Sequence, residues 1–333
     1  MALTSLPPVT DPNDSSSSRP AAAPPADRPA RLPRRDVHGV LLLDKPLGLS
    51  SNDALVRAKR LLRANKAGHT GTLDPLATGL LPLCFGEATK FSQDLLDADK
   101  EYIATLRLGQ ETTTGDAEGE VVQELPVTCD TAAVEAAARA FLGPIAQIPP
   151  MYSALKKDGK PLYAYARAGE VVERAARAVT IHEIEVLSCA VPEVTLRVLC
   201  SKGTYIRTLA EDIGRHLGCG AHLTALRRTR VGALSLDGAL TLEQLGECDD
   251  AVRPAQLAPV DRLLATLPEI RLDAEGARRF GHGQRLALRD VLGGGKSPGN
   301  GILVRVYHDS DATLLGVARV EAGALRPERL VRL

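Results

Sequence analysis

The sequence AGHTGTLDPLATGLLP, residues 67–82, contains a single carboxylate, Asp74, and apart from His69 no other ionisable side chain. An Asp followed by Pro is typical of a helix N-cap, because Pro is favoured at the first helical position. The residues that follow, ATGLLPLCFG, would form a weak helix, interrupted by Gly79 and Pro82. The glycines on both sides also permit close approach of a ligand backbone. Asp74 is therefore interpreted either as a helix cap or as the carboxylate of a functional site.

Length and composition favour two folded domains. The chain has 333 residues, of which 44% are hydrophobic, enough for a sizeable core. Its 41 basic and 41 acidic residues cancel, so a nucleic-acid partner would require a local basic patch. No apolar run reaches the length of a membrane span, and the N-terminus lacks the pattern of a signal peptide. Six scattered cysteines without a CxxC pair are typical of reduced thiols, so we expect a cytoplasmic protein without membrane contact.

Patterns along the chain predict a mixture of helices and strands after a disordered tail. Residues 1–36, rich in Pro, Ser and Ala, cannot form a core and are expected to be disordered. Hydrophobic periodicity and capping residues predict the ordered elements. These are a strand at Val40–Leu43, a helix from about Ser51 capped by Ser50 or Ser51, a strand over 101–109, a helix over 130–142 stopped by Gly143-Pro144, strands over 179–188 and 194–200, a helix after Gly203, and short strands from about residue 251.

The segment 147–174 has no regular pattern and interleaves basic and aromatic side chains. Its lysines are Lys156, Lys157 and Lys160, named here the clasp lysines, and its tyrosines include Tyr163 and Tyr165. This composition suits a loop that grips single-stranded or looped RNA. An ordinary surface excursion is the alternative, and the segment alone does not decide between them.

Arg207 lies in the first turn of the helix predicted after Gly203, where the helix dipole disfavours a cation. It could pair with Glu211, four residues later. It could instead be required by a carboxylate elsewhere in the fold, and Asp74 is the candidate. A lone carboxylate does not make an ordinary glycosidase, which needs two. It can act as a nucleophile or as an electrostatic partner for a sugar cation.

Other patterns fail as cofactor or metal sites. The run GGGKS resembles the end of a phosphate-binding loop, but Asp290 stands where the pattern requires glycine. His216, Cys219 and His222 have no fourth ligand nearby. We therefore expect neither a bound metal nor a cofactor.

Seven segments closely resemble the TruB family of tRNA pseudouridine synthases. They occur along the chain in the same order as in the family, over about residues 38–235. They are LDKPLGLSS, GHTGTLDPLATGLLPLCFGEATKF, KEYIATLRLG, TTTGDAEGE, QIPPMYSALKKDGKPLYAYAR, CSKGTYIRTLAEDIG and LGCGAHLTALRRTRVG. The resemblance implies an α+β fold with a mixed central sheet and an active-site cleft in a catalytic domain over 37–250. It also implies that 147–174 is an insertion that clasps RNA. A weaker resemblance at 254–333 implies a small β-rich, PUA-like RNA-binding domain.

The family isomerises uridine 55 in the T loop of tRNA to pseudouridine, so the resemblance implies that activity and the tRNA T-arm as partner of a monomeric enzyme. Asp74 is implied as the catalytic carboxylate and Arg207 as the arginine that pairs with it, lowers its pKa and keeps it ionised. Tyr102 is implied to pack on the flipped base and to take part in proton transfer. The implied substrate-binding residues are His69, Tyr102, Tyr205, Leu226 and Lys45, the last in a turn that supports the site. Asp116 is expected to have a structural role only.

Two alternatives remain from the sequence. One is a non-catalytic module that binds or folds tRNA with the same fold. The other is an RNA N-glycosylase that releases uracil. The combination of Asp74, Tyr102 and Arg207 favours the isomerase.

Overall fold

The computed structural model of the chain describes residues 33–292 and 298–332. Most of the tail predicted to be disordered, 1–32, therefore lies outside the described residues. Arg35, at its end, is held in place, because its backbone N–H donates to Arg63 O (2.9 Å) and its guanidinium donates to Leu62 O (3.0 Å). None of the helices in the described ranges is long and apolar enough to cross a membrane.

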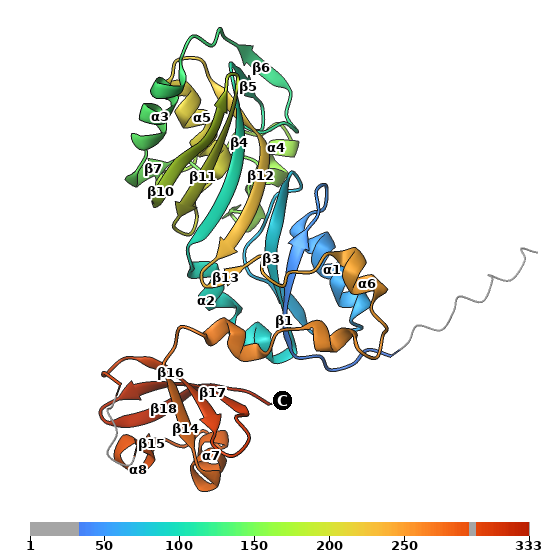
Figure 1. Cartoon of the computed structure of the whole chain (residues 1–333), viewed down its shortest axis with the longest axis vertical. Coiled ribbons are helices and arrows are strands. Elements are labelled where there is room, and N and C mark those ends of the chain that lie inside the picture. Colours follow the sequence, from blue (N-terminus) through green and yellow to red (C-terminus); the bar gives the residue numbers. More distant parts are fainter. Residues whose placement is uncertain (1–32, 293–297, 333) are drawn as a thin grey trace, which may run out of the picture. The chain divides into compact units, whose positions relative to one another are not determined.

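A nine-stranded mixed sheet forms the centre of the larger, N-terminal part of the described chain (Figure 1). The predicted strand at 40–43 is confirmed as part of β1, and the two predicted strands around residue 190 are confirmed as β10 and β11. The order across the sheet is β1 (Gly39–Lys45), β3 (Ala77–Phe85), β12 (Ala221–Val231), β4 (Lys100–Leu108), β11 (Glu193–Cys200), β10 (Arg177–Ala190) and β7 (Gly143–Gln147), with β2 (Ala67–His69) on β3 and β13 (Leu234–Ser235) on β12. The pairing of β3 with β12 is parallel and the others are antiparallel.

The prediction of a weak helix after Asp74 is wrong, because residues 77–85 form strand β3. Eight of its nine residues are buried, since β3 lies between β1 and β12 and both of its faces are covered. A continuous apolar run is what such a strand requires. Gly79 has φ +96°, and a Cβ there would collide with the Arg228 carbonyl oxygen of β12. Gly79 therefore allows the two strands to pair closely rather than ending a helix.

The helices bury the apolar stripes that the sequence predicts. Helix α1 (Ser51–Leu61) begins as expected after Ser50, whose side chain accepts the Asp53 N–H (3.1 Å). Helix α5 (Ile206–His216) buries Ile206, Leu209 and Ile213. Helix α3 (Thr131–Arg139) ends three residues before the predicted end, because Phe141 and Leu142 form a turn before β7. The shorter helices are α2 (Ser92–Asp97), α4 (Leu162–Arg167), α6 (Leu242–Glu247) and the 3₁₀ segments Gly86–Phe91, Arg253–Gln256 and Val260–Leu264.

Strand β4 shows the predicted alternation. Lys100, Tyr102, Ala104, Leu106 and Leu108 are buried and the residues between them are less so. This period of two places the Tyr102 ring on the inner face of the sheet. A small hairpin, β5 (Gln110–Thr112) with β6 (Val121–Glu124), follows β4.

The segment 147–174 is mostly irregular, as expected, with one short hairpin, β8 (Lys156–Lys157) and β9 (Lys160–Pro161), before α4.

The C-terminal residues form a second, β-rich part with a core of its own, which includes Phe280, Val304 and Val306. The short strands predicted from about residue 251 are thus confirmed, although the middle of the GGGKSPGNG loop, 293–297, lies outside the described residues. Its five-stranded sheet has the order β14 (Glu269–Leu272), β16 (Leu303–His308), β17 (Leu314–Glu321), β18 (Ala324–Leu330) and β15 (Leu286–Ala287), with helices α7 (Ala274–Gly281) and α8 (Leu288–Leu292).

Candidate active site

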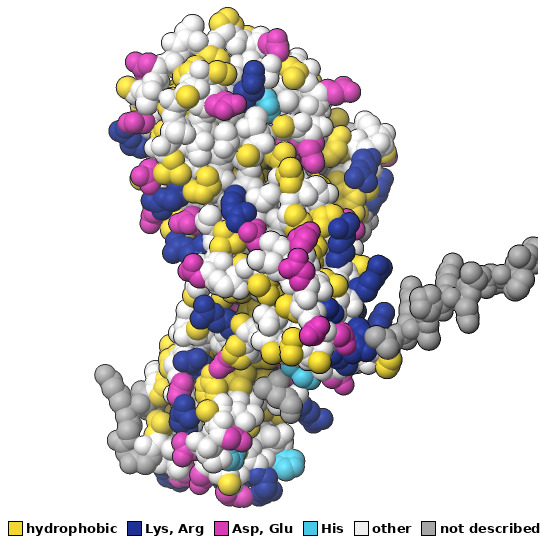
Figure 2. Space-filling model, turned by 45° about the vertical axis from the view of Figure 1, so that its right-hand side comes forward, with side chains coloured by type: hydrophobic (Ala, Val, Ile, Leu, Met, Phe, Trp, Pro, Cys, Tyr) yellow, Lys and Arg dark blue, Asp and Glu magenta, His cyan; other side chains and the backbone are white. Residues whose placement is uncertain are grey.

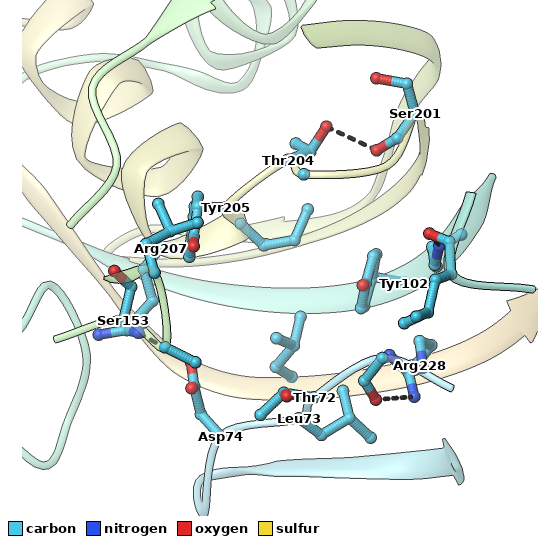
Figure 3. A pocket seen from close by; sticks show the side chains of 18 residues that line it. Thr72, Leu73, Asp74, Tyr102, Ser153, Ser201, Thr204, Tyr205, Arg207 and Arg228 are labelled. Carbon is cyan, nitrogen blue, oxygen red and sulfur yellow. Dashed lines mark hydrogen bonds and ion pairs between the residues drawn. The ribbon is translucent and has the colours of Figure 1, made fainter. Parts of the chain in front are cut away.

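A cavity of about 340 Å³ opens beside the strands β4 and β12 (Figure 3). Its wall is contributed by the loop before β3, the start of β4, residues 153–155, the turn 201–205, the first residues of α5, and β12. Asp74 is its one acidic lining residue among the described residues. Of the residues predicted for the site, the cavity brings together Asp74, Tyr102, Tyr205, Arg207 and Leu226.

Asp74 sits in a turn, and not at a helix N-cap, because Asp74 O accepts the Ala77 N–H (3.0 Å) and strand β3 follows. Buried Ser51, at the start of α1, fixes this turn: its hydroxyl accepts the Leu73 N–H (2.7 Å) and donates to Leu73 O (3.1 Å). Pro75 O accepts a further hydrogen bond from Gly48 N (2.8 Å). The carboxylate is thus carried by backbone anchored to α1 and to the Lys45–Ser50 turn.

Arg207 pairs with Asp74 across the cavity wall, Nη2 to Oδ2 at 2.9 Å. Its Nη1 also lies 3.5 Å from Asp116 Oδ2. Backbone carbonyls of Thr114 (3.0 Å) and Tyr152 (2.6 Å) accept further hydrogen bonds from the guanidinium, whose side chain is only 6% exposed. The pairing with a distant carboxylate is confirmed. Glu211, the alternative partner, instead forms an ion pair with Arg215 (3.6 Å).

Burial raises the pKa of the Asp74 carboxyl, and the neighbouring Asp116 charge raises it further, while Arg207 and Lys45 act in the opposite direction. Arg207 thus lowers the pKa of Asp74 as expected, but desolvation outweighs the arginine, so that the net shift of this pKa is upward. Although 40% of the Asp74 side chain is accessible from the cavity, protein atoms surround the rest and remove much of its hydration. The role of Arg207 is to limit this rise in pKa.

Asp116 contributes more to the site than its sequence context indicates. Its side chain is 3% exposed and accepts hydrogen bonds from Thr114 Oγ1 (2.5 Å) and Glu118 N (3.1 Å). These bonds aim the carboxylate at Arg207, so the arginine lies between two acids. The segment TTTGD gives the local bonds but not the distant partner, which only the fold provides.

Tyr102 is buried on β4 and its ring forms one wall of the cavity. Burial raises the pKa of its hydroxyl, whereas the charge of Arg228 and a hydrogen bond with it lower that pKa. Arg228, on β12, is 1% exposed and was not identified from the sequence. The run RRTR offers three similar arginines, and only strand register distinguishes the one that faces inward.

Tyr205 and Leu226 line the cavity from opposite elements. Tyr205 precedes α5, and its backbone is fixed by Gln147, which accepts from Tyr205 N (3.0 Å) and donates to Tyr205 O (3.3 Å). Burial raises the pKa of the Tyr205 hydroxyl. Leu226 lies on β12 between Ala77 of β3 and Ala104 of β4. Together they offer largely apolar surface for a planar ring.

Lys45 and His69 lie outside the cavity lining. Lys45 is fully buried, and its amine donates to Pro46 O (3.0 Å) and Leu49 O (2.6 Å), which supports the turn below Asp74. Burial lowers the Lys45 pKa to about 8. His69 is on β2, and burial together with the Arg228 charge lowers its pKa. The structure thus places both residues next to the site but not among the residues that line the cavity.

The clasp lysines are partly or fully exposed around the β8–β9 hairpin. Lys160 Nζ stands 4.2 Å from the centre of the Tyr165 ring and 3.8 Å from Glu170 Oε1. On the face drawn in Figure 2, basic and acidic side chains alternate without a broad field of one sign. Because the basic and acidic residues of the whole chain balance, contact with a polyanion would depend on local basic groups such as the clasp lysines.

The two histidines among the residues weighed as metal ligands have other contacts. The His216 ring packs edge-on against Phe141, and His222 Nδ1 lies 3.0 Å from Gln110 O. Within the described ranges, no group of three or more His, Cys, Asp or Glu side chains is arranged to hold a metal ion.

Comparison with known proteins gives matches along almost the whole chain. Residues 59–206 match the model of the TruB family pseudouridylate synthase N-terminal domain, residues 207–265 that of the tRNA pseudouridylate synthase B C-terminal domain, and residues 268–331 that of the pseudouridine synthase II TruB C-terminal domain. The chain is 71% identical over 310 residues to the tRNA pseudouridine synthase B of Cupriavidus pinatubonensis, covering 92% of this chain and 98% of that protein. It is 65% identical over 323 residues to the protein of the same name from Burkholderia lata, covering 96% and 98%.

Solved structures support the fold. An H/ACA RNP bound to a substrate RNA containing 2′-deoxyuridine includes a chain that matches with a TM-score of 0.67 and 26% identity, over 89% of this chain and 86% of that one. A chain of a Cbf5-Nop10-Gar1 complex matches with a TM-score of 0.66 and 28% identity, over 88% and 84%.

Proposed function

Because this chain belongs to the TruB family of pseudouridine synthases, we propose that it isomerises uridine 55 in the T loop of tRNA to pseudouridine. The observation that carries the proposal is the pairing of Asp74 with buried Arg207 on the wall of a cavity that, within the described part of the chain, has no second acid among its lining residues. One carboxylate suits an isomerisation in which a sugar–base bond breaks and a new one forms. It does not suit ordinary glycoside hydrolysis, which uses two carboxylates.

The target base leaves the stack before reaction, because its glycosidic bond is inaccessible inside folded RNA. The C1′–N1 bond then breaks, the base turns, and C1′ bonds to C5. N1 gains a proton and C5 loses one, so the RNA keeps its composition. Asp74 supplies the carboxylate, and both of its possible targets, the base and the sugar, require the ionised form. Arg207 favours that form against the effect of burial.

The remaining walls hold the base. Tyr102, Tyr205 and Leu226 all line the cavity, so a planar uracil ring can pack against their side chains. Tyr102 also presents the hydroxyl that exchanges a proton with the base. His69 and Lys45 act around the site, His69 on the extruded nucleotides and Lys45 as support for the Asp74 turn.

RNA binding is assigned to the parts outside the cavity. The catalytic domain over 37–250 carries the insertion 147–174, whose clasp lysines contact phosphates of the T-arm. The domain over 254–333 is PUA-like and extends the RNA contact. We expect the enzyme to be monomeric, and tRNA as the substrate implies action in the cytoplasm.

The decisive assay is tritium release from a T-arm transcript that contains [5-³H]uridine. Isomerisation releases the C5 tritium to water while the chain stays intact. Tight binding without release would support the alternative of a tRNA-binding or tRNA-folding module. Free uracil would show that the protein is an N-glycosylase.

A further inference from the structure

Gln147 is a buried amide whose partner lies in a distant part of the chain. It is the last residue of the edge strand β7 and is 2% exposed. Its Oε1 accepts the Tyr205 N–H (3.0 Å) and its Nε2 donates to Tyr205 O (3.3 Å). Burying an amide is costly unless both of its polar ends find partners, and here the backbone of one residue supplies both. This exchange of one donor and one acceptor resembles the pairing of two antiparallel strands.

The contact of Gln147 with Tyr205 stands where α5 has no cap of its own. Tyr205 is the N-cap residue of α5, but its side chain makes no capping hydrogen bond, and its O accepts the N–H of Leu209 (3.1 Å). The first turn of a helix needs partners from outside the helix for its free N–H groups. Gln147 therefore holds the start of α5 in place of a cap. Arg207 belongs to this first turn, and its guanidinium lies 2.9 Å from Asp74.

Gln147 also lies at the base of the insertion 147–174. The two ends of the insertion meet there, because Gln147 is the cross-strand partner of Arg177 on β10 and Arg174 Nη1 donates to Pro149 O (3.0 Å). The residue that holds the start of α5 is therefore also the residue from which the insertion departs.

A second contact joins the insertion to α5. Tyr152 O accepts a hydrogen bond from Arg207 Nη2 (2.6 Å), and Ser153 follows Tyr152 into the wall of the cavity (Figure 3). The insertion thus holds the first turn of α5 at two points, through Gln147 and through Tyr152. Two contacts fix the direction of this turn as well as its position, which a single contact does not.

We propose that Gln147 is a positioning residue that keeps Tyr205 and Arg207 in place for reaction while the insertion grips RNA. The inference rests on the proposed function and adds a residue to it. Gln147 is not among the residues that line the cavity, so it acts on the substrate through the start of α5. Reaction rates depend steeply on such placement, because a displacement of about 1 Å can cost about 100-fold. Loss of the amide should therefore slow the reaction more than it weakens RNA binding.

The first test replaces Gln147 by methionine, which has a similar length but offers no hydrogen-bond donor. Single-turnover tritium release should fall by about 10- to 100-fold, whereas T-arm affinity should change by less than about twofold. The acid limb of kcat/KM should also move to higher pH, because a displaced Arg207 opposes the rise in the Asp74 pKa less well. A loss of rate with an unmoved acid limb would overturn the proposal, since a smaller amount of folded protein scales the rate equally at every pH.

The second test replaces Gln147 by glutamate, which keeps the shape of the side chain and also serves if Gln147→Met does not fold. A protonated carboxyl has a donor and an acceptor and can make both bonds to Tyr205, whereas an ionised one has acceptors only and repels Tyr205 O. Burial raises the pKa of such a carboxyl, and the charge of the cross-strand partner Arg177 opposes part of this rise. Relative to the wild type at the same pH, Gln147→Glu should therefore be most active in acid and lose activity as pH rises. A ratio that stays constant with pH would contradict the role of the amide.

Gln244 provides the matched control. It is likewise an amide at the start of a helix, since its Oε1 accepts the Thr241 N–H (2.9 Å) at α6. No residue of α6 lines the cavity. Gln244→Met should therefore leave the acid limb unchanged, and an equal displacement of the limb in both variants would count against the proposal.

Hydrogen exchange in the free protein distinguishes failure of this proposal from failure of the proposed function. Gln147→Met should speed exchange of the backbone amides over 205–209 by about 10-fold or more, because the start of α5 opens more often, and Gln244→Met should not. Unchanged exchange in a folded Gln147 variant would refute the contact even if the wild-type protein is active. The expected change in exchange, in a protein that releases no tritium, would support the contact and count against the proposed function alone.

Discussion

Replacing Arg207 by leucine is expected to destabilise the protein at neutral pH and to lower its turnover at low pH. The change removes a guanidinium that lies 2.9 Å from Asp74 and 3.5 Å from Asp116, and it deprives two backbone carbonyls of their donors. Leucine fills similar space but offers no donor. Asp116, with a side chain that is 3% exposed, is then left as a buried charge without its cation.

The geometry sets the size of the effect. At an effective dielectric constant of about 20, unit charges at these two distances attract by about 6 and about 5 kcal/mol. Solvent weakens the first attraction, because the Asp74 side chain is 40% exposed. Removing Arg207 also removes the cost of desolvating its charge, which reduces the net loss of stability. Breaking one partner of a buried pair costs about 3–5 kcal/mol in practice, and we expect a loss of that size at neutral pH.

The pH dependence has a definite sign. Burial already raises the pKa of Asp74 above its usual value, and without Arg207 it rises further. A carboxyl whose pKa is higher in the folded than in the unfolded state loses stability as pH rises through the folded value. The stability gap between the variant and the wild type should therefore be wide at neutral pH and narrow in acid. Turnover requires ionised Asp74, so the acid limb of kcat/KM should move to higher pH in the variant.

Urea denaturation followed by tyrosine fluorescence measures the stability, because five of the six tyrosines precede residue 250 and the chain has no Trp. Arg215→Leu is the control on the same helix. Arg215 forms three ion pairs but its side chain is 55% exposed, so its removal should cost no more than about 1 kcal/mol. Equal destabilisation of the two variants, or a gap that widens in acid, would refute this account of the site.

Three further substitutions test other parts of the structure. Asp74→Asn should abolish tritium release while leaving the fold and T-arm affinity intact, and appreciable turnover would exclude the assigned role. Changing all three clasp lysines to Gln should weaken RNA binding and flatten its dependence on salt by a slope of about 2–3 if each contacts a phosphate; an unchanged slope would mark the loop as an ordinary surface. Gly79→Ala should lower stability by about 2–4 kcal/mol, from backbone strain and collision with β12. Gly48→Ala shares the positive φ but has open space around it, so equal melting temperatures would contradict the steric argument.

Local sequence patterns predicted those helices and strands that have one buried face and one exposed face. The period of two in β4 and the apolar stripe of α5 both appear in the structure as expected. The capping of α1 by Ser50 was predictable because a cap depends on the next few residues only. Each of these features is determined within a single element.

Strand β3 was missed because its apolar run has no period. A short continuous run fits a buried strand and a buried helix equally well. The partner that decides between them, β12, comes more than a hundred residues later. Gly79 and Pro82, which are unfavourable within a helix, fit a strand whose neighbours approach closely.

The site residues likewise divide into those that a local sequence pattern reveals and those that only the fold reveals. Arg207 attracted attention because a cation in the first turn of a helix is locally unfavourable. Arg228 breaks no local rule, since an arginine in an RRTR run is usually exposed. Its burial without a carboxylate partner is visible only when β12 is placed between β3 and β4.

The two arginines give the cavity an uneven distribution of charge that suits the proposed reaction. Arg207 is outnumbered by Asp74 and Asp116, so that part of the wall carries a net negative charge. Among the described residues, no acid forms an ion pair with Arg228, which lies beside Tyr102 on the neighbouring strand, so that part is positive. When the C1′–N1 bond breaks, positive charge develops on the sugar and negative charge on the base. A wall with fixed charges of opposite sign stabilises both only if the sugar faces Asp74 and the base faces Tyr102, because charges already in place need no reorganisation as the bond breaks.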